Sequence, residues 1–441
     1  MIGKLGALVV GLTLVAVGPA PGQAAFWQRL GDTTLVRLVA EVVQSNNDVD
    51  AGRARVQGAR AARLDAALDF APAVTATASY TRQRLSSAAF PGSFAAAFPD
   101  QNVWDAGVQL SWELDLFGRI RKSTQARGAL ISAAEEDVQD LQVLLASELA
   151  SAYFDLRGTQ ERLQVARRNA ENQQHTLDVT VQRLEAGRGN EFDSERARAQ
   201  LNSTLAGIPA LEASVAALEH RIAVLVGRAG TGIEEQPANG ASFPALPDSI
   251  VVPNPDVVVR LRPDVRSAER QVAAGNAFVS AAKAAYLPRI SVGGGAGYVG
   301  TTFEALGNSN TPRYAIGPVI SWPALNLGRV KAGVDAARAQ ESEAEAYYRK
   351  AQLQASQEIA TTVVTYNKAR QSLAYLVAAA NASERAAGLA RLRFDEGASD
   401  FLQVLDAERT MLEAQDRLAA GRTAATTSLV ALYRALGGTV P

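Results

Sequence analysis

The sequence contains one long stretch twice, and this duplication limits the possible folds more than any other feature. Residues 107–227 align with residues 317–437 at a constant offset of 210 positions, without a gap. Each copy has an alternating strand ending in tryptophan, a Gly-Arg pair, a very long helical pattern, a glycine-centred turn and a second helical pattern. We therefore predict one fold made of two similar halves. The identical pairs include Ser111/Ser321, Trp112/Trp322, Gly118/Gly328, Arg119/Arg329, Arg183/Arg393, Gly187/Gly397 and Gly227/Gly437.

A shorter matching block precedes each copy at an offset of 216 positions, as in the pair Pro72/Pro288. The offset must change between Pro72 and Gly107, where a run rich in Ser, Ala, Pro and Gly predicts a surface loop. The duplication divides the chain into five parts. These are a leader (1–25), a first repeat (26–227), a linker dense in Gly and Pro (228–261), a second repeat (262–437) and a short tail (438–441).

The first 25 residues have the order of a secretory signal peptide: Lys4, the apolar run Leu5–Val17, and small residues up to Ala25. The alternative is a transmembrane anchor, but the apolar run is too short for a comfortable span. No later segment approaches 18 uninterrupted apolar residues. We therefore expect any membrane residence to be achieved without transmembrane helices.

Cysteine content and charge exclude several classes of site. The 441 residues include no cysteine, which rules out disulfides, thiolate metal sites, a cysteine nucleophile and a lipid-bearing N-terminal cysteine. The absence of cysteine suits an oxidising compartment. A formal net charge of −1 lacks the excess positive charge typical of proteins that bind nucleic acid.

Four segments alternate between apolar and polar or small residues, which predicts strands. Each is roughly nine to eleven residues long, as a tilted strand across a bilayer requires, and aromatic residues lie near the strand ends. Pro318 cannot donate to a strand ladder, so we expect a bulge or local irregularity there. Four strands cannot close a barrel, so we expect further strands from copies of the same chain. The four segments are 74–81, 104–114, 290–298 and 314–322.

The helical patterns are unusually long. Residues 119–185 and 329–396 contain no proline, and each would form a helix on the order of 100 Å long. Apolar residues at steps of three, four and seven predict a narrow coiled-coil seam. We expect one helix over 34–70, glycine-capped turns at Gly187 and Gly397, and returning helices over 192–226, interrupted at Pro209, and 401–436.

Ser111–Arg121, and its echo Ser321–Val330, resemble the signature of the TolC-like outer-membrane factors, and in particular the OprM/NodT-like channels of RND efflux pumps. The signature residues are Trp112, Gly118, Arg119, Trp322, Gly328 and Arg329. The resemblance implies a mainly α fold: a long coiled-coil-like helical barrel, plus four transmembrane strands per chain in a trimeric 12-stranded β-barrel. It also implies a homotrimer in outer-membrane lipid, with a periplasmic tunnel, a periplasmic adaptor protein and an inner-membrane pump of RND type.

The same resemblance assigns roles at the two hairpin tips. Turns like Arg183–Gly187 and Arg393–Gly397, together with Ser399, meet the adaptor in the family. Positions at which family members carry aperture acids hold Asp193, Gln403 and Asp406, of which Gln403 departs from the pattern. The family's latch partners fall on Phe394 and Ser399, so this chain lacks the tyrosine hydroxyl and the arginine of that latch. Asp193 is equally well explained as an acid favoured by a helix N-terminus.

Candidate chemistry is otherwise absent. Gly295–Gly300 matches a dinucleotide fingerprint, but no helix follows it and small residues suit close strand packing. We interpret His175, His220 and the acidic run Glu135–Asp137 as solvated helix positions. No phosphate-binding loop is present, so the energy for transport must come from another protein. We predict neither catalytic residues nor bound cofactors or metals.

The sequence thus favours a passive exit duct for small toxic compounds in a multidrug-resistance type of efflux system. A duct for type I protein secretion uses the same fold and stays open as an alternative. A secreted coiled-coil scaffold would not need four bilayer-length strands, and a secreted enzyme would need a catalytic constellation.

Overall fold

The computed structural model describes residues 26–84, 100–228, 243–247, 250, 252 and 254–438. The chain divides into two compact units. Unit 1 comprises Met1–Gly52, Val138–Pro263 and Gln352–Pro441, and unit 2 comprises Arg53–Asp137 and Asp264–Ala351. Each unit therefore draws residues from both sequence copies. The predicted leader and most of the loop between the first two strands lie outside the described residues.

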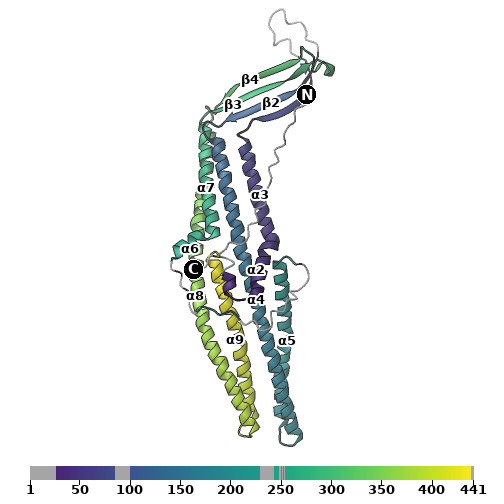
Figure 1. Cartoon of the computed structure of the whole chain (residues 1–441), viewed down its shortest axis with the longest axis vertical. Coiled ribbons are helices and arrows are strands. Elements are labelled where there is room, and N and C mark those ends of the chain that lie inside the picture. The colour runs from purple at the N-terminus through teal and green to yellow at the C-terminus, as the bar shows by residue number, and fades with distance from the viewer. Residues whose placement is uncertain are drawn as a thin grey trace, which may run out of the picture. The chain divides into compact units, whose positions relative to one another are not determined.

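Unit 2 contains the four predicted strands, paired as one antiparallel sheet in the order β1-β2-β3-β4 (Figure 1). Pro318 pairs in regular register with Val292, so the predicted bulge or local irregularity is wrong. The proline is tolerated because β4 is an edge strand of this sheet. The 3₁₀ turns Ala284–Tyr286 and Phe303–Ala305 precede and follow β3. The strands are β1 (Ala73–Gln83), β2 (Gln101–Leu114), β3 (Arg289–Gly300) and β4 (Pro312–Ser321).

The strand register gives the sheet two chemically different faces. One cross-strand row is Val74, Leu110, Gly294 and Ile316, and the next row on that face is Ala76, Val108, Ala296 and Tyr314. The opposite face has rows such as Thr75, Gln109, Gly295 and Ala315. On the apolar face Ile316 is 72% and Tyr314 86% exposed within the single chain. Water does not favour such a surface.

In both sequence copies a tryptophan side chain at the end of a strand donates a hydrogen bond to a backbone carbonyl. The Nε1–H of Trp112 donates to the Phe70 carbonyl at 2.8 Å, and that of Trp322 donates to the Tyr286 carbonyl at 3.0 Å. Each tryptophan thus connects the end of the second strand of a pair (β2 or β4) to the turn that precedes the first strand (β1 or β3).

The predicted first helix is two helices, α2 (Thr33–Ser45) and α3 (Asn47–Leu68), because Asn46 takes an extended conformation between them. Its Oδ1 accepts from the Asp48 amide at 2.8 Å and caps α3, while its Nδ2 donates to the Leu225 carbonyl at 2.8 Å. Asparagine is well suited to such a cap. An unbroken helix would leave these groups unpaired.

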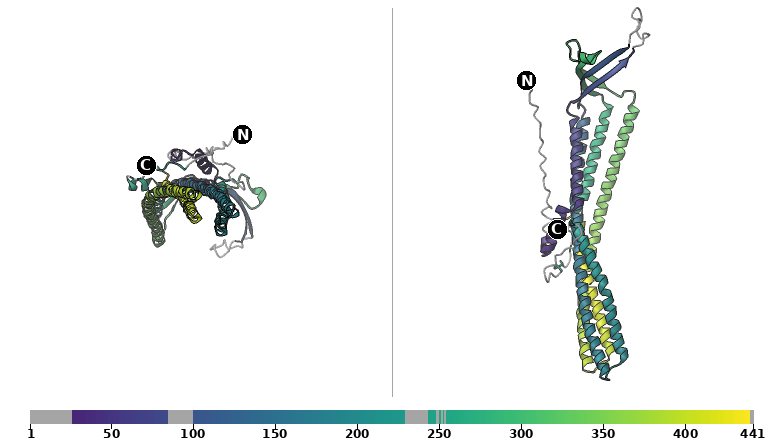
Figure 2. Two further views of the ribbon diagram at one scale, coloured as in Figure 1. Left: turned by 90° about the horizontal axis from the view of Figure 1, so that it is seen from below. Right: turned by 90° about the vertical axis from the view of Figure 1, so that its right-hand side faces the viewer.

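The long helices are present as predicted. α4 (Arg119–Glu185) has 67 residues and α8 (Leu327–Asp395) has 69, while the returning helices α5 (Glu191–Leu225) and α9 (Phe401–Ala435) have 35 each. The predicted interruption at Pro209 is wrong, because α5 continues through it. Seen from below, α8, α9 and α5 lie along an arc (Figure 2, left).

By length and composition alone α5 could cross a membrane. It nevertheless forms ion pairs with α4, such as Arg167 with Glu212 at 2.6 Å and Arg221 with Glu148 at 2.9 Å. The expectation of a membrane protein without transmembrane helices stays a prediction.

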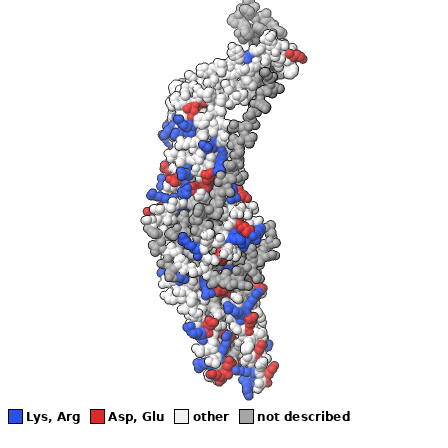
Figure 3. All heavy atoms as spheres, viewed as in Figure 1, with Lys and Arg blue, Asp and Glu red and all other residues white. Residues whose placement is uncertain are grey.

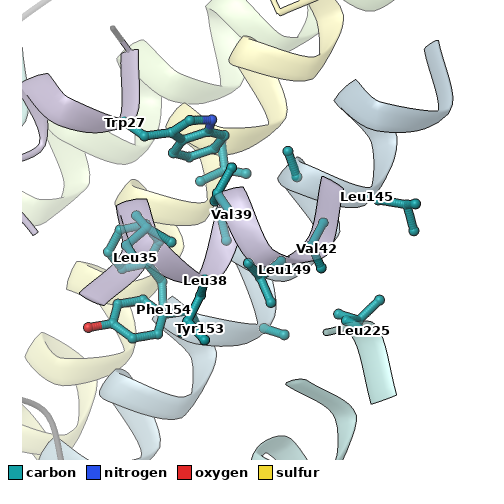
Figure 4. Close-up of a cluster of buried hydrophobic side chains, with 14 of the residues drawn as sticks. Trp27, Leu35, Leu38, Val39, Val42, Leu145, Leu149, Tyr153, Phe154 and Leu225 are labelled. Carbon is teal, nitrogen blue, oxygen red and sulfur yellow. The ribbon is translucent and has the colours of Figure 1, made fainter. Parts of the chain in front are cut away.

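The core of unit 1 forms where α2 packs on α4 (Figure 4). Leu35, Leu38 and Val42 of α2 are at most 1% exposed, and Leu149 of α4 is fully buried. The first described residues join the core, since the Phe26 and Trp27 rings each lie 4.6 Å from the Tyr433 ring.

The structure describes part of the predicted linker. It contains the short helix α6 (Pro255–Leu261), and the Ile250 amide donates to the Asn367 side chain at 3.1 Å. α7 (Pro263–Lys283) then leads to β3.

Charged side chains of both signs are scattered over the helices, whereas the sheet is mostly uncharged in the view of Figure 3. The charged residues of the described strands are Arg82, Asp105, Glu113, Arg289 and Arg313.

Candidate functional site

The two hairpin tips of unit 1 have nearly identical geometry. At the first, Gly187 has a φ of +69° and its amide donates to the Leu184 carbonyl at 2.9 Å. At the second, Gly397 has a φ of +72° and its amide donates to the Phe394 carbonyl at 3.0 Å. A side chain at either glycine would meet no neighbour within 4 Å. Glycine is needed here for its left-handed backbone rather than for space.

Each returning helix begins with a side-chain cap. Asn190 Oδ1 accepts from the Phe192 amide at 2.9 Å, and Asp400 Oδ1 accepts from the Gln403 amide at 3.1 Å. Asp193 lies in the first turn of α5, where the helix dipole favours a carboxylate. The Gln403 side chain is exposed one turn into α9.

Arg183 joins the two hairpins. Its guanidinium carbon lies 4.0 Å from the centre of the Phe394 ring, and its Nη2 lies 3.8 Å from Asp395 Oδ1. The Phe394 ring in turn lies 5.5 Å from the Phe401 ring of α9. The sequence suggested a tip role for Arg183 and a latch position for Phe394, and the structure brings the two into contact. An arginine stacked on an aromatic ring contributes about 0.5–2 kcal/mol.

Other predicted tip residues do not meet. Asp406 has a side chain that is 68% exposed, and among the described residues it pairs along its own helix, with Arg409 at 3.1 Å. No contact joins Asp406 to Asp193 among the described residues. Arg393 is exposed, and the Ser399 hydroxyl oxygen is buried without a partner in the described part of the chain.

The sequence reading missed Glu408, which is only 3% exposed. Its Oε1 accepts from Arg391 Nε at 2.7 Å and lies 3.4 Å from Thr176 Oγ1. It therefore links α8, α9 and α4. Its Oε2, Arg391 Nη2 and Gln173 Oε1 are buried without hydrogen-bond partners among the described residues, so this cluster is incompletely satisfied.

Glu408 belongs to a polar ladder between the hairpins. Arg162, Asn169 and Thr176 follow at seven-residue steps on α4, as do Arg422, Gln415 and Glu408 on α9. Two rungs join these series directly, Asn169 with Gln415 at 3.4 Å and Thr176 with Glu408. At the third step each arginine pairs outside the series, Arg162 with Asp416 at 2.6 Å and Arg422 with Glu161. This repeat was a signal available in the sequence. The Arg162 and Asp416 side chains are 39% and 41% exposed, so solvent screens this rung, whereas Glu408 is buried.

Apolar side chains also pack around this seam. The cluster consists of Ala170, Leu177, Ala197, Leu201, Phe401 and Val404, from α4, α5 and α9. Next to it a cavity of about 160 Å³ is lined by Asn172, His175, Arg391 and Asp395, among others. His175 and His220 are exposed, as predicted.

In unit 2 the predicted solvation of Glu136 is wrong. This residue is 6% exposed and pairs with Arg266 of α7, while its neighbour Glu135 pairs with Arg60 at 2.7 Å. Burial raises the pKa of Glu136, an effect opposed by Arg266 and Arg270. The helix pattern could not reveal that α7 packs over this turn of α4.

The family signature forms a structural corner in the first copy. Gly118 has a φ of +79°, Asp115 caps α4 by accepting from the Ile120 amide at 2.9 Å, and Arg119 holds Glu113 through two bonds of 2.8 and 2.9 Å. In the second copy Gly328 already lies inside α8, and Pro323 occupies the place of Glu113 opposite Arg329. The signature thus builds a strand-to-helix junction rather than a ligand site.

Comparison with known proteins gives consistent matches along nearly the whole chain. The family model for "Outer membrane efflux protein" matches residues 38–228 and 255–438. The solvent efflux pump outer membrane protein SrpC of Pseudomonas putida is 30% identical over 413 residues, covering 92% of this chain and 86% of that protein. Nodulation protein T of Rhizobium leguminosarum bv. trifolii is 27% identical over 395 residues, with 90% and 83% covered. The solved outer-membrane channel OprN aligns with a TM-score of 0.85 at 38% identity, over 96% of this chain and 93% of that one.

Proposed function

The chain belongs to the outer membrane efflux protein family and is an outer-membrane protein, and from this premise we propose that it is the exit duct of a tripartite efflux system. The observation that carries the proposal is the two-faced sheet, with apolar side chains exposed on one face and Thr, Ser, Gln and Gly on the other. Such a sheet suits lipid on one side and a water-filled lumen on the other.

The proposed assembly is a homotrimer. The outer strands β1 and β4 have unpaired edges among the described residues. Lipid does not tolerate open edges, so these edges must pair with other copies. Three chains would then supply twelve strands to one barrel, while their long helices would line a periplasmic tunnel.

The proposed partners are a periplasmic adaptor and an inner-membrane pump of RND type. The tips at Gly187 and Gly397, with Arg183, Arg393 and Ser399, are the surface we assign to the adaptor. The chain has no phosphate-binding loop, so the pump must supply the energy. Family membership supports these partners.

We assign the periplasmic aperture to the same end of unit 1, at Asp406, Gln403 and Asp193. The contact of Arg183 with Phe394 and Asp395, and the Glu408 cluster, replace the family's latch and hold the second hairpin against the first. Three copies of exposed Asp406 near one axis would favour cations there.

We propose small toxic organic compounds as the cargo. SrpC is named for solvent efflux, which is a statement about that relative. Among the described residues no group of His, Cys, Asp and Glu could hold a metal ion.

The test is outer-membrane fractionation, followed by gel migration with and without heating and by a drug and metal susceptibility panel on a deletion strain. A heat-modifiable oligomer in the outer membrane and increased sensitivity to organic compounds are expected. A soluble monomer would overturn the proposal.

The aperture is tested separately by single-channel recording of Asp406→Ala, with Glu413→Ala as the control. Glu413 is also an exposed acid on α9 and pairs along the helix with Arg417 at 3.6 Å. Cation selectivity should fall in Asp406→Ala alone. Equal effects of the two variants would remove Asp406 from the aperture.

A further inference from the structure

One ion pair on the polar face of the sheet spans three strands. Arg313 of β4 reaches across β3 and binds Asp105 of β2 through its Nη2. The strand register places Gly297 beside Arg313 and Val299 beside Asp105. The guanidinium therefore crosses the intervening strand rather than extending away from the sheet.

Glycines lie beside this crossing. A side chain on Gly295 would lie 3.9 Å from Arg313 Nη1, and one on Gly297 would lie 2.6 Å from the Cα of Gly107. The absence of side chains at these positions gives the arginine a flat surface to lie on. At Gly297 the close approach of the Gly107 backbone requires glycine, whereas at Gly295 a methyl group would make only an ordinary contact with the arginine.

The pair is isolated from other charge. In the described strands, the remaining charged residues of this face are Glu113 and Arg289, at the end of the sheet next to the helices. Glu113 is already held by Arg119. The rest of the face around Arg313 and Asp105 consists of Thr, Ser, Gln, Gly, Ala and Val.

The Arg313–Asp105 ion pair contributes little to the stability of the sheet. The side chains of Arg313 and Asp105 are 36% and 27% exposed, and solvent screening leaves ion pairs of this kind with little effect on stability. An arginine on the wall of a narrow pore, in contrast, changes both the bore and the field that ions experience. Its carboxylate partner cancels that charge and keeps the long side chain against the wall.

We propose that Asp105 holds Arg313 flat against the glycine surface, and that this pair sets the ionic selectivity and the bore of the strand-lined part of the duct. The proposal rests on the proposed function, because it requires the polar face to line the lumen. Without Asp105, three uncompensated arginines would extend into the lumen of a trimer. Without Arg313, three carboxylates would remain.

The test is the reversal potential and single-channel conductance of the full-length protein in planar bilayers under a potassium chloride gradient. Asp105→Asn should lower the conductance and raise the chloride-to-potassium permeability ratio. Arg313→Gln should lower that ratio, and the double variant should return towards wild type. Arg313→Lys keeps the charge, so its ratio should stay close to that of wild type.

Arg82→Gln is the matched control. Arg82 also pairs with an aspartate, Asp100 at 3.2 Å, but it extends the apolar face of β1. Its selectivity should not change. If wild type forms channels and all of these variants share its permeability ratio, the pair does not line the pore and the inference fails. If wild type forms no channel at all, the proposed function fails first.

Discussion

Gly158, in the middle of α4, should resist substitution because α9 passes close to it. A Cβ at this position would overlap the Thr423 hydroxyl and lie 3.0 Å from Thr423 Cβ. Rotating the threonine moves the hydroxyl but not its Cβ, and it breaks the 3.0 Å bond from Thr423 Oγ1 to the Ala419 carbonyl. Gly158→Ala therefore forces α4 and α9 apart or strains both.

The expected size follows from opposing terms. Alanine improves helix propensity by about 1 kcal/mol. Overpacking costs about 1–3 kcal/mol, and the lost hydrogen bond costs about 0.5–1.5 kcal/mol. We expect a net destabilisation of about 1–2 kcal/mol. Rotation of the threonine loses the hydrogen bond but relieves part of the overpacking, so the two costs do not add in full. For 441 residues, an unfolding entropy of about 2.1 cal/mol/K per residue gives roughly 1 °C per kcal/mol, so the melting temperature should fall by about 1–2 °C.

The assay is thermal unfolding of the purified protein in detergent, followed by circular dichroism at 222 nm and at one scan rate. Gly128→Ala is the control in the same helix, because its new methyl group would be 3.5 Å from the nearest atom, Arg63 Nε. It should gain about 0.5–1 kcal/mol. Thr423→Ala removes the hydroxyl overlap but keeps the Cβ at 3.0 Å, so it should rescue Gly158→Ala in part, and the two changes should be strongly non-additive. A Gly158→Ala protein as stable as Gly128→Ala, or no rescue, would refute the predicted close approach.

Three further outcomes are expected from the same unfolding assay. Asp32→Ala removes the α2 cap (Thr34 amide at 3.0 Å) and the hydrogen-bond partner of the Tyr153 hydroxyl (2.7 Å), so it should lower the free energy of unfolding by about 2–4 kcal/mol. Tyr153→Phe loses the second hydrogen bond alone and should cost less. Equal costs for the two variants would contradict this assignment. Trp322→Phe keeps an aromatic ring but loses the bond to the Tyr286 carbonyl, and should cost about 1 kcal/mol; an unchanged melting temperature would show that the bond contributes nothing. Burial raises the pKa of Glu136, so its ionisation opposes folding, and wild type should lose stability relative to Glu136→Gln as pH rises from about 4 through the raised pKa. A difference that does not change with pH would contradict that assignment.

The strands and long helices were predictable because their signals are local. Alternation fixed β1 to β4 within a few residues, and the absence of proline from 119–185 fixed α4. Asn46 and Pro209 were misjudged for opposite reasons. The Asn46 side chain finds partners in a distant carbonyl and the next helix, whereas the packing of α5 tolerates one missing amide.

The candidate site was less accessible from sequence. The glycine caps at the tips depend only on backbone conformation and were confirmed. The burial of Glu136 and Glu408 depends on which helices lie over them, and helical periodicity within α4 or α9 does not contain that information. The contact of Arg183 with Phe394 likewise joins residues far apart in the chain. The aperture and adaptor roles stay predictions.

The alternating register of the sheet would also govern strand pairing between copies in the proposed trimer. If a neighbouring strand paired with a register shift of one residue, its apolar side chains would face water and its hydroxyl groups would face hydrocarbon. Both surrounding media would then oppose the misaligned arrangement at once. Lipid and water together would then select the correct register between subunits, without specific side-chain contacts at the interface.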